Sequence, residues 1–288
     1  FQGLFTQGMV CHETYKDKDN KWLSPNEVDT NDGKKFFLKK DPTKKVIVGS
    51  SESMSKSKKN TIDPEEIIKN YGADAVRLFI LSDSPPEKDV QWSERGMIAS
   101  FKFLQKFWLL HKKIKDQTLL KSKIKNDNSS STSLKEFTNE LIEKVTRNLE
   151  KFHYNVIIAN FYETYNFLIK LIEKPIKQDD LLTNYLKILK IMTPIAPHFA
   201  SECLEEFGEK EQVFWPKLNK KYLEKKELNI VFQVNGKKRG IINCKINTNE
   251  KQLISGLKNN SLYKKYFENK KIVRSIYVKE RLINLIIQ

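Results

Sequence analysis

Ser53-Met54-Ser55-Lys56-Ser57 is the stretch of this sequence whose residue types best suit chemistry. Ser55 and Ser57 are small hydroxyl donors that allow a ligand to come close to the backbone, and Lys56 between them carries a mobile ammonium group. Such a loop suits a triphosphate, because the ammonium can follow negative charge as it develops on the phosphates. A solvated surface run of lysine and serine has the same composition, so the flanking residues must decide between the two interpretations.

The residues on either side of this loop predict the elements that position it. Val46-Ile47-Val48 favours a short strand that leads into the loop. After the loop, Asp63 and Pro64 have the residue types of an N-cap and a first helical position, and Gly72 separates this helix from a second one at 73–81. The sequence therefore predicts a loop between a strand and a helix N-terminus, where a phosphate binds favourably.

Residues 54–81 closely resemble the ATP-binding segment of the leucyl, isoleucyl, valyl and methionyl members of the class I aminoacyl-tRNA synthetases, whose signature pentapeptide is KMSKS. The resemblance implies that the loop binds ATP and that Lys56 is the catalytic residue that stabilises charge on the reacting phosphate. The implied ATP-binding residues are Ser53, Met54, Ser55, Lys56 and Ser57. The sequence departs from the signature at Ser53, where these families have a lysine, so the loop is expected to carry less positive charge.

Further stretches resemble the leucyl-tRNA synthetases of bacteria and organelles in particular. Residues 4–10 resemble the strand near the end of their catalytic fold, and residues 12–46 resemble the small leucine-specific insertion before the signature loop. Residues 234–239 and 281–287 resemble their C-terminal domain. The resemblance implies part of a leucine–tRNA ligase, which activates leucine with ATP and Mg²⁺ and transfers it to tRNA(Leu).

Other hallmarks of that family do not occur in these 288 residues. The sequence contains no HIGH-type signature, zinc-binding insertion or editing domain, all of which precede this region in the leucyl-tRNA synthetases. We therefore expect the C-terminal portion of a longer enzyme, or one chain of a two-chain enzyme, that is inactive without the upstream catalytic half. Two alternatives stay open: a sister synthetase for valine, isoleucine or methionine, and a tRNA- or RNA-binding protein without catalysis.

The composition agrees with a polyanionic partner but does not identify one. The formal net charge is +16, yet lysine supplies 46 of the 52 basic residues, a bias that AT-rich codon usage also produces. Cys11, Cys203 and Cys244 are far apart, and the four histidines are scattered, which predicts a reducing compartment and no metal site. No apolar run approaches the roughly 18 residues of a membrane span, so we expect the cytoplasm or an organellar matrix and no membrane partner.

The pattern of apolar residues predicts a multidomain protein. Residues 1–92 are expected to form the end of an α/β nucleotide-binding domain of the Rossmann type, with the insertion and the loop. Residues 93–227 are expected to form an α-helical bundle with a lysine-rich linker at 217–227, because apolar residues recur at spacings of three and four. The polar run 126–133 is predicted to be a loop. The resemblance implies that the bundle binds the anticodon stem of tRNA.

Residues 228–288 predict a small α+β domain of ββαββ type. Ile230, Phe232 and Val234 alternate with polar residues before an Asn235-Gly236 hairpin turn. A helix at 250–267 and strands at 272–278 and 282–287 are expected to complete this domain.

Three cations, Lys237, Lys238 and Arg239, directly follow the hairpin turn. The resemblance implies that they bind tRNA, where the exposed bases and crowded phosphates of the tRNA elbow allow docking without sequence readout. Ordinary solvated hairpin charges are the alternative interpretation.

Overall fold

The loop follows a strand of a small sheet in the computed structural model, which describes residues 3–31, 33, 35–119, 128–209, 214–223, 227–268 and 270–288. The central strand β1 (Val10–Lys16) pairs antiparallel with β2 (Trp22–Leu23) and β6 (Ile47–Ser53). At the start of β1, β7 (Val90–Gln91) pairs with it in parallel. The predicted strand before the loop is therefore present as β6.

The segment before β1 differs from the prediction for residues 4–10. The strand begins at Val10, and the backbone N–H groups of Gly8 and Met9 donate to Pro86 O and Asp89 Oδ1, both at 2.8 Å. A Cβ atom on Gly8 would lie 2.1 Å from Lys88 O, so the close approach of these two segments requires glycine. The strand prediction was wrong because these hydrogen bonds go to a loop rather than to a neighbouring strand.

The insertion forms a separate three-stranded antiparallel sheet. After the short 3₁₀ helix η1 (Pro25–Glu27), β3 (Val28–Thr30), β4 (Phe36–Leu38) and β5 (Asp41–Lys45) pair in this order. The buried side chains that join this sheet to β1 and β2 are Tyr15, Leu23, Val28 and Val46. This three-stranded sheet is thus fixed to β1 and β2 by a small core of its own.

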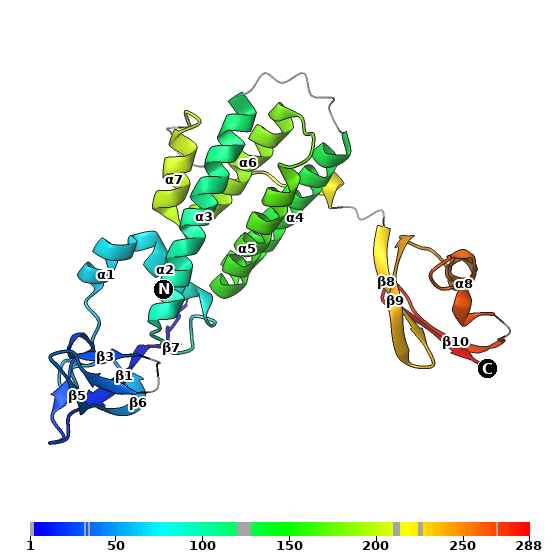
Figure 1. Ribbon diagram of the computed structural model, residues 1–288. Helices are drawn as coiled ribbons and strands as arrows, with labels where there is room; N and C mark the ends of the chain where they lie inside the picture. The colour runs from blue at the N-terminus through cyan, green and yellow to red at the C-terminus, as the bar shows by residue number, and fades with distance from the viewer. Residues whose placement is uncertain are drawn as a thin grey trace. The chain divides into compact units, whose positions relative to one another are not determined.

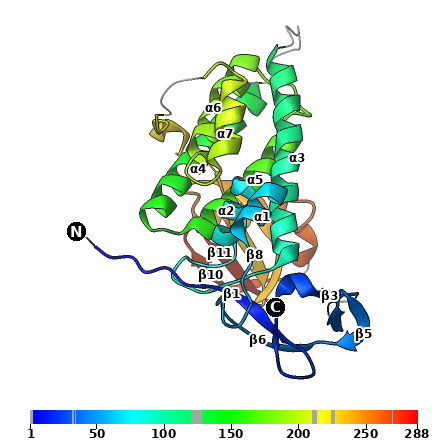
Figure 2. The same ribbon diagram turned by 90° about the vertical axis from the view of Figure 1, so that its left-hand side faces the viewer.

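Two short helices follow the loop as the sequence predicts. Asp63 is the N-cap of α1 (Pro64–Tyr71), and its side chain accepts a hydrogen bond from the Glu65 N–H at 2.9 Å. Gly72, with φ of +81°, separates α1 from α2 (Ala73–Ser82). In Figures 1 and 2, α1 and α2 lie between the blue strands and the green helices, so they connect the loop to the helical part of the chain.

The first compact unit spans Phe1–Asn219, so the domain boundary predicted near residue 92 lies inside it. A helical bundle makes up most of the rest of this unit. Its helices are α3 (Glu94–Leu119), α4 (Asn128–Glu150), α5 (Tyr154–Leu171), α6 (Gln178–Met192) and α7 (Pro197–Glu205). The largest fully buried side chains of their shared core are Tyr185, Phe107, Phe161, Ile114, Leu134, Ile142, Ile157, Ile158, Leu168 and Leu181.

The polar run 126–133 is not a loop where it is described. Residues 128–133 belong to the first turns of α4, and Ser130 and Ser131 are buried there, whereas residues 126 and 127 lie outside the described part. An ion pair of 2.7 Å between Lys135 and Asp180 also joins this end of α4 to α6. Serine is small enough to be packed between helices, which the local composition alone does not reveal.

The second compact unit spans Lys220–Gln288. After the 3₁₀ helix η2 (Lys220–Tyr222), it contains β8 (Glu227–Val234), β9 (Lys237–Lys245), α8 (Glu250–Asn259), η3 (Lys264–Tyr266), β10 (Ile272–Val278) and β11 (Leu282–Ile287). The strand order is β10-β11-β8-β9, and β11 lies inside the sheet, parallel to β8. Of the lysine-rich linker, residues 224–226 lie outside the described part.

The core and turns of the second unit follow the predicted alternation. Ile230, Phe232 and Val234 are buried against Leu253 and Leu257 of α8. Asn235 and Gly236 both have positive φ, +49° and +78°, as a two-residue hairpin turn requires. The helix predicted at 250–267 is shorter and ends at Asn259, because Asn260 has extended backbone and η3 follows as a separate turn.

Candidate functional site

The loop that leaves β6 contains a compact turn that begins at Lys56 and ends at Lys59. The Ser55 and Ser57 hydroxyls lie 2.8 Å apart, and the Lys58 N–H donates to Ser55 Oγ at 3.3 Å. The Lys59 N–H donates to Lys56 O at 3.2 Å, and Lys59 has a left-handed φ of +54°. These contacts leave Lys56 and Ser57 exposed to solvent. The two serines thus shape the turn, as their residue types suggest.

The residues before the turn are held in the sheet. Ser53 is the last residue of β6 and is exposed, and it pairs with Cys11 of β1. The Met54 N–H donates to Val10 O at 3.3 Å, and its side chain is half-buried. The position at which the sequence departs from the signature therefore lies in β6 at the base of the loop, whereas Lys56 begins the exposed turn.

The loop lysines differ in whether a carboxylate already neutralises them. Lys58 Nζ forms an ion pair with Glu52, and this hydrogen bond lowers the pKa of the Glu52 carboxyl. Lys56 and Lys59 are exposed and have no ion-pair partner among the described residues. Lys56, which the resemblance assigns to ATP, is therefore a loop cation that no described carboxylate neutralises.

The helix N-terminus beyond the loop does not carry the charge that a phosphate prefers. Asp63, Glu65 and Glu66 occupy the cap and first turn of α1, and the Asp63 carboxylate already accepts the Glu65 N–H. Negative side chains stabilise a helix start but repel an anion at the same place. The positive charge near this loop therefore comes from its lysines and not from the helix.

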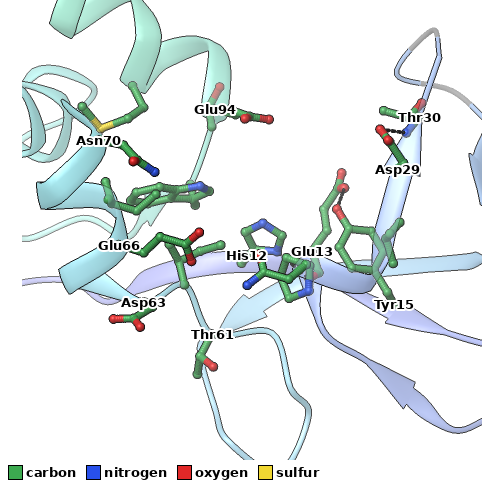
Figure 3. A pocket seen from close by; sticks show the side chains of 18 of the residues that line it. His12, Glu13, Tyr15, Asp29, Thr30, Thr61, Asp63, Glu66, Asn70 and Glu94 are labelled. Atoms are coloured by element: carbon green, nitrogen blue, oxygen red, sulfur yellow. Dashed lines mark hydrogen bonds between the residues drawn. The ribbon is translucent and has the colours of Figure 1, made fainter. Parts of the chain in front are cut away.

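A cavity of about 680 Å³ lies beside the loop, between β1, the insertion, α1 and the start of α3. Figure 3 shows Glu13 and Tyr15 of β1 on one side of it and Glu66 and Asn70 of α1 on the other. Its lining carries the carboxylates of Glu13, Asp29, Asp63, Glu66 and Glu94. This negative charge disfavours a triphosphate, and Lys56 is not part of the lining.

Tyr15 illustrates the electrostatics of this cavity. Its hydroxyl donates to Glu13 Oε2 at 3.1 Å. Burial, followed by the negative charge of Glu13, raises the pKa of the Tyr15 hydroxyl far above its usual value. Tyr15 therefore stays protonated and acts as a hydrogen-bond donor.

Asn60 is a loop residue that the sequence analysis did not single out. Its side chain is fully buried, and its Oδ1 accepts a hydrogen bond from the Ser55 N–H at 2.8 Å. Its Nδ2 donates to His12 O and to Glu52 O, each at 3.2 Å. The local signal is weak, since a single asparagine after two lysines is also typical of an exposed loop.

A polar clamp joins α2 to the corner before α7. Asp74 is buried, and its Oδ1 lies 2.9 Å from His198 Nδ1. The Arg77 side chain donates from Nε to Ile195 O at 3.0 Å and from Nη2 to Pro194 O at 2.8 Å. Because α2 follows the loop closely in sequence, this clamp connects the loop region to the helical bundle.

A second polar network is buried inside the bundle. His111 has no exposed surface, and its Nδ1 and Nε2 lie 3.1 Å from the Tyr185 hydroxyl and from Glu206 Oε2. Lys112 and Lys115 also form ion pairs with Glu206. Burial lowers the pKa of His111, so it is neutral, and its Nε2–H must donate because a carboxylate only accepts.

The three predicted tRNA-binding cations lie at a β-bulge in the second unit. Lys237 and Lys238 pair with Val234 and Gln233, but Gly240 pairs with Phe232, so Arg239 is the extra residue. All three cations are exposed. The Arg239 guanidinium lies 5.2 Å from the centre of the Tyr266 ring, which Lys265 Nζ also approaches at 5.4 Å.

Two features of the described residues bear on other functions. In those ranges, no three His, Cys, Asp or Glu side chains gather in a way that would bind a metal ion. Across the same residues, no helix is both long and apolar enough to cross a membrane.

Two family models match parts of the chain. The model described as "tRNA synthetases class I (I, L, M and V)" matches residues 37–93, which include the loop, α1 and α2. The model described as "Anticodon-binding domain of tRNA ligase" matches residues 133–254. The predicted combination of a class I synthetase segment with an anticodon-binding domain is thereby confirmed.

Curated relatives match the chain from end to end. A leucine–tRNA ligase of Orientia tsutsugamushi is 37% identical over 292 residues, which covers 100% of this chain and 34% of the relative. A leucine–tRNA ligase of Bartonella henselae is 35% identical over 301 residues, which again covers 100% of this chain and 34% of the relative. The chain is homologous to leucyl-tRNA synthetases along its whole length. It spans about a third of the length of these curated relatives.

A solved leucyl-tRNA synthetase shares the fold. The ternary complex of this enzyme from Agrobacterium radiobacter K84 with tRNA and LeuAMS superposes with a TM-score of 0.67, at 23% identity, over 82% of this chain and 31% of that chain. The resemblance to leucyl-tRNA synthetases that the sequence shows is thus confirmed by relatives and supported by the fold.

The predicted residues fall into two groups. Ser53 to Ser57 lie together at the end of β6 and in the loop that follows it, in the first unit, and Lys237 to Arg239 lie together at one bulge of the second. Asn60 and the clamp residues Asp74 and Arg77 are additional residues that the structure, and not the sequence, brings to attention.

Proposed function

We propose that this chain supplies the ATP loop and the tRNA-docking parts of a leucine–tRNA ligase. In the first step, a carboxylate oxygen of leucine attacks the α-phosphate of Mg²⁺-bound ATP, which forms leucyl-adenylate and releases pyrophosphate. In the second step, a ribose hydroxyl of the terminal adenosine of tRNA(Leu) takes the leucyl group and AMP leaves. Neither step needs a side-chain nucleophile, so the protein contributes positioning and charge stabilisation.

The observation that carries this proposal is the exposed Lys56 in a loop whose start is tied to the sheet. Its ammonium is not neutralised by a described carboxylate, in contrast to that of Lys58. In the proposed reaction, Lys56 stabilises negative charge on the phosphates, and Ser55 and Ser57 give the turn its shape. Ser53 and Met54 hold the base of the loop in the sheet.

The remaining parts of the chain have roles in tRNA binding in this proposal. Residues 1–92 form the end of the nucleotide-binding domain, 93–227 the anticodon-stem bundle with its linker, and 228–288 a C-terminal docking domain. Lys237, Lys238 and Arg239 meet the tRNA backbone there. An upstream catalytic half, in the same chain or a partner chain, supplies the leucine pocket.

Cys11, Cys203 and Cys244 are not joined by disulfides, which fits a reducing compartment such as the cytoplasm or an organellar matrix, where tRNA charging takes place.

Amino acid-dependent exchange of pyrophosphate into ATP tests the proposal, with this chain joined to an upstream catalytic half. We expect leucine to support exchange, and valine, isoleucine and methionine to fail at the same concentration. Exchange with one of the other three would instead identify a sister synthetase. Binding of tRNA(Leu) without any exchange would favour a non-catalytic RNA-binding protein.

A further inference from the structure

Asn60 is fully buried although it directly follows exposed lysine and serine side chains. Its amide accepts the Ser55 N–H and donates to His12 O and Glu52 O. A carboxamide can do both at once, whereas a carboxylate only accepts and an apolar side chain does neither. Replacement of Asn60 would therefore leave buried backbone groups without a partner, which is costly.

The three partners of Asn60 belong to different segments. His12 is in β1, Glu52 is near the end of β6, and Ser55 is the residue from which the turn departs. The amide thus fixes the start of the turn to two strands that are already paired with each other. Beyond this point, the backbone hydrogen bond from Lys59 N–H to Lys56 O stays within the turn, and the ion pair of the Lys58 side chain with Glu52 is a further tie to β6.

We propose that Asn60 is the positioning residue of the ATP loop. It fixes the backbone of Ser55, so that Lys56 projects in one direction before ATP arrives. A charge that is already oriented needs no reorganisation when the reaction begins, and the entropy of ordering the loop is not lost at that moment. Asn60 itself does not touch the substrate and acts through Lys56. This inference rests on the function proposed above.

Hydrogen exchange on the 288-residue chain tests the positioning without requiring catalysis. We expect Asn60→Ala to accelerate exchange of the Ser55 N–H at least about tenfold, while amides of α3 and α6 keep their protection. Asn60→Asp retains the acceptor for the Ser55 N–H, so it should accelerate the exchange of this amide less than Asn60→Ala does. It also serves as a second variant in case Asn60→Ala fails to fold. The matched control is Asn184→Ala, which removes a buried amide from α6, where Nδ2 donates to Asp180 O at 2.7 Å. Unchanged protection of Ser55, or equal loss of protection throughout the first unit, would overturn the proposal.

A double-mutant cycle tests whether Asn60 acts through Lys56. The measurement is kcat/KM for ATP in leucine-dependent pyrophosphate exchange, in the enzyme that joins this chain to the upstream half. We expect Asn60→Ala alone to lower kcat/KM for ATP at least about tenfold. The variant with both Asn60→Ala and Lys56→Ala should have the same kcat/KM as Lys56→Ala within about twofold. A purely structural role would give losses that multiply, and this result contradicts the proposal. If the parent enzyme shows no leucine-dependent exchange, the proposed function fails, while the hydrogen-exchange experiment still decides the role of Asn60.

Discussion

The carboxylate of Asp74 accepts a hydrogen bond from the backbone N–H of Phe199 at 2.6 Å. Asp74 belongs to α2 and Phe199 to the first turn of α7, so a helix near the loop supplies the cap of a helix in the bundle. The sequence of α7 offers no capping side chain of its own, since its N-cap is Ala196. A negative charge at a helix N-terminus is also stabilising through the helix dipole.

We predict that this clamp contributes strongly to the stability of the first unit. Asp74→Asn and Arg77→Ala should each lower the free energy of unfolding by about 1.5–3 kcal/mol, the range for hydrogen bonds to charged groups. Urea denaturation followed by tryptophan fluorescence reports this unit specifically, because all four tryptophans lie within it. The control is Asp83→Asn at the exposed end of α2, which should stay within about 0.5 kcal/mol of the wild type. Equal effects at Asp74 and Asp83 would contradict the prediction.

The second prediction concerns Lys56. In the enzyme joined to its upstream half, Lys56→Ala should lower the rate of leucine activation by about 10²–10³-fold, as expected for loss of one preorganised charge from a transition state. Leucine affinity should hardly change, since the loop faces phosphate. Ser53→Ala should be nearly neutral, because Ser53 lies at the base of the loop. Equal losses for the two variants, measured by pyrophosphate exchange, would argue against the role of Lys56.

The third prediction concerns the chain by itself. We expect the 288 residues alone to make no leucyl-adenylate, because the proposed function assigns the leucine pocket to an upstream half. Addition of that half should restore leucine-dependent pyrophosphate exchange. Exchange by the isolated chain would show that it holds a complete active site.

The fourth prediction concerns pH and the His111 network. Burial lowers the pKa of His111 from its usual 6.5, so below that pH the unfolded chain binds a proton that the folded chain does not. Stability should therefore fall as the pH drops below 6.5. It should fall again below 4.5, because the hydrogen bonds of Lys112 and Lys115 lower the pKa of Glu206 from 4.5 to about 2.

The comparison with His111→Gln isolates the histidine. Urea denaturation at a series of pH values should show that the stability difference between wild type and variant shrinks as the pH falls through the range below 6.5. The loss below pH 4.5 should persist in the variant, since Glu206 and its lysines remain. A stability difference that is constant from pH 7 to pH 5 would show that His111 is not linked to folding.

The fifth prediction concerns the bulge cations. Replacement of Lys237, Lys238 and Arg239 by alanine should reduce the slope of log affinity for tRNA(Leu) against log salt concentration by about 2–3, if each contacts one phosphate. The control replaces three other lysines by alanine: Lys245 at the far end of β9, and Lys251 and Lys258 on α8. It removes the same charge and should change the slope much less. Fluorescence anisotropy over a range of KCl concentrations measures both. Equal slopes for the two triple variants would mean that only net charge matters.

Deletion of residues 228–288 gives a complementary measurement. It should weaken tRNA charging strongly and leave leucine activation nearly intact, because these residues form most of a unit with a core of its own. Full charging by the shortened enzyme across a range of salt would exclude a docking role for the second unit.

Local signals in the sequence are sufficient for the elements around the loop. The cap at Asp63 and the break at Gly72 depend on the conformational preferences of single residue types, and a sequence shows residue types directly. The hairpin turn at Asn235-Gly236 is predictable for the same reason. In contrast, the start of β1 depends on contacts of Gly8 and Met9 with residues far along the chain.

The buried half of the candidate site is not accessible from the sequence. The loop sequence gives the exposed lysine and its serines, but the role of Asn60 depends on a carbonyl 48 residues away in β1. Likewise, the partners of His111 lie 74 and 95 residues away on other helices. No local periodicity encodes such separations, so only the folded chain identifies these residues.

The position of β11 inside the second sheet has a consequence for synthesis on the ribosome. β8 ends at Val234, but the strand that covers its free edge ends at Ile287. At translation rates of about 5–20 residues per second, the intervening residues take about 3–10 s to make. During that time the hairpin of β8 and β9 presents Ile230, Phe232 and Val234 and an unpaired strand edge to other nascent chains. We expect this hairpin to be the segment of the second unit that ribosome-associated chaperones bind first.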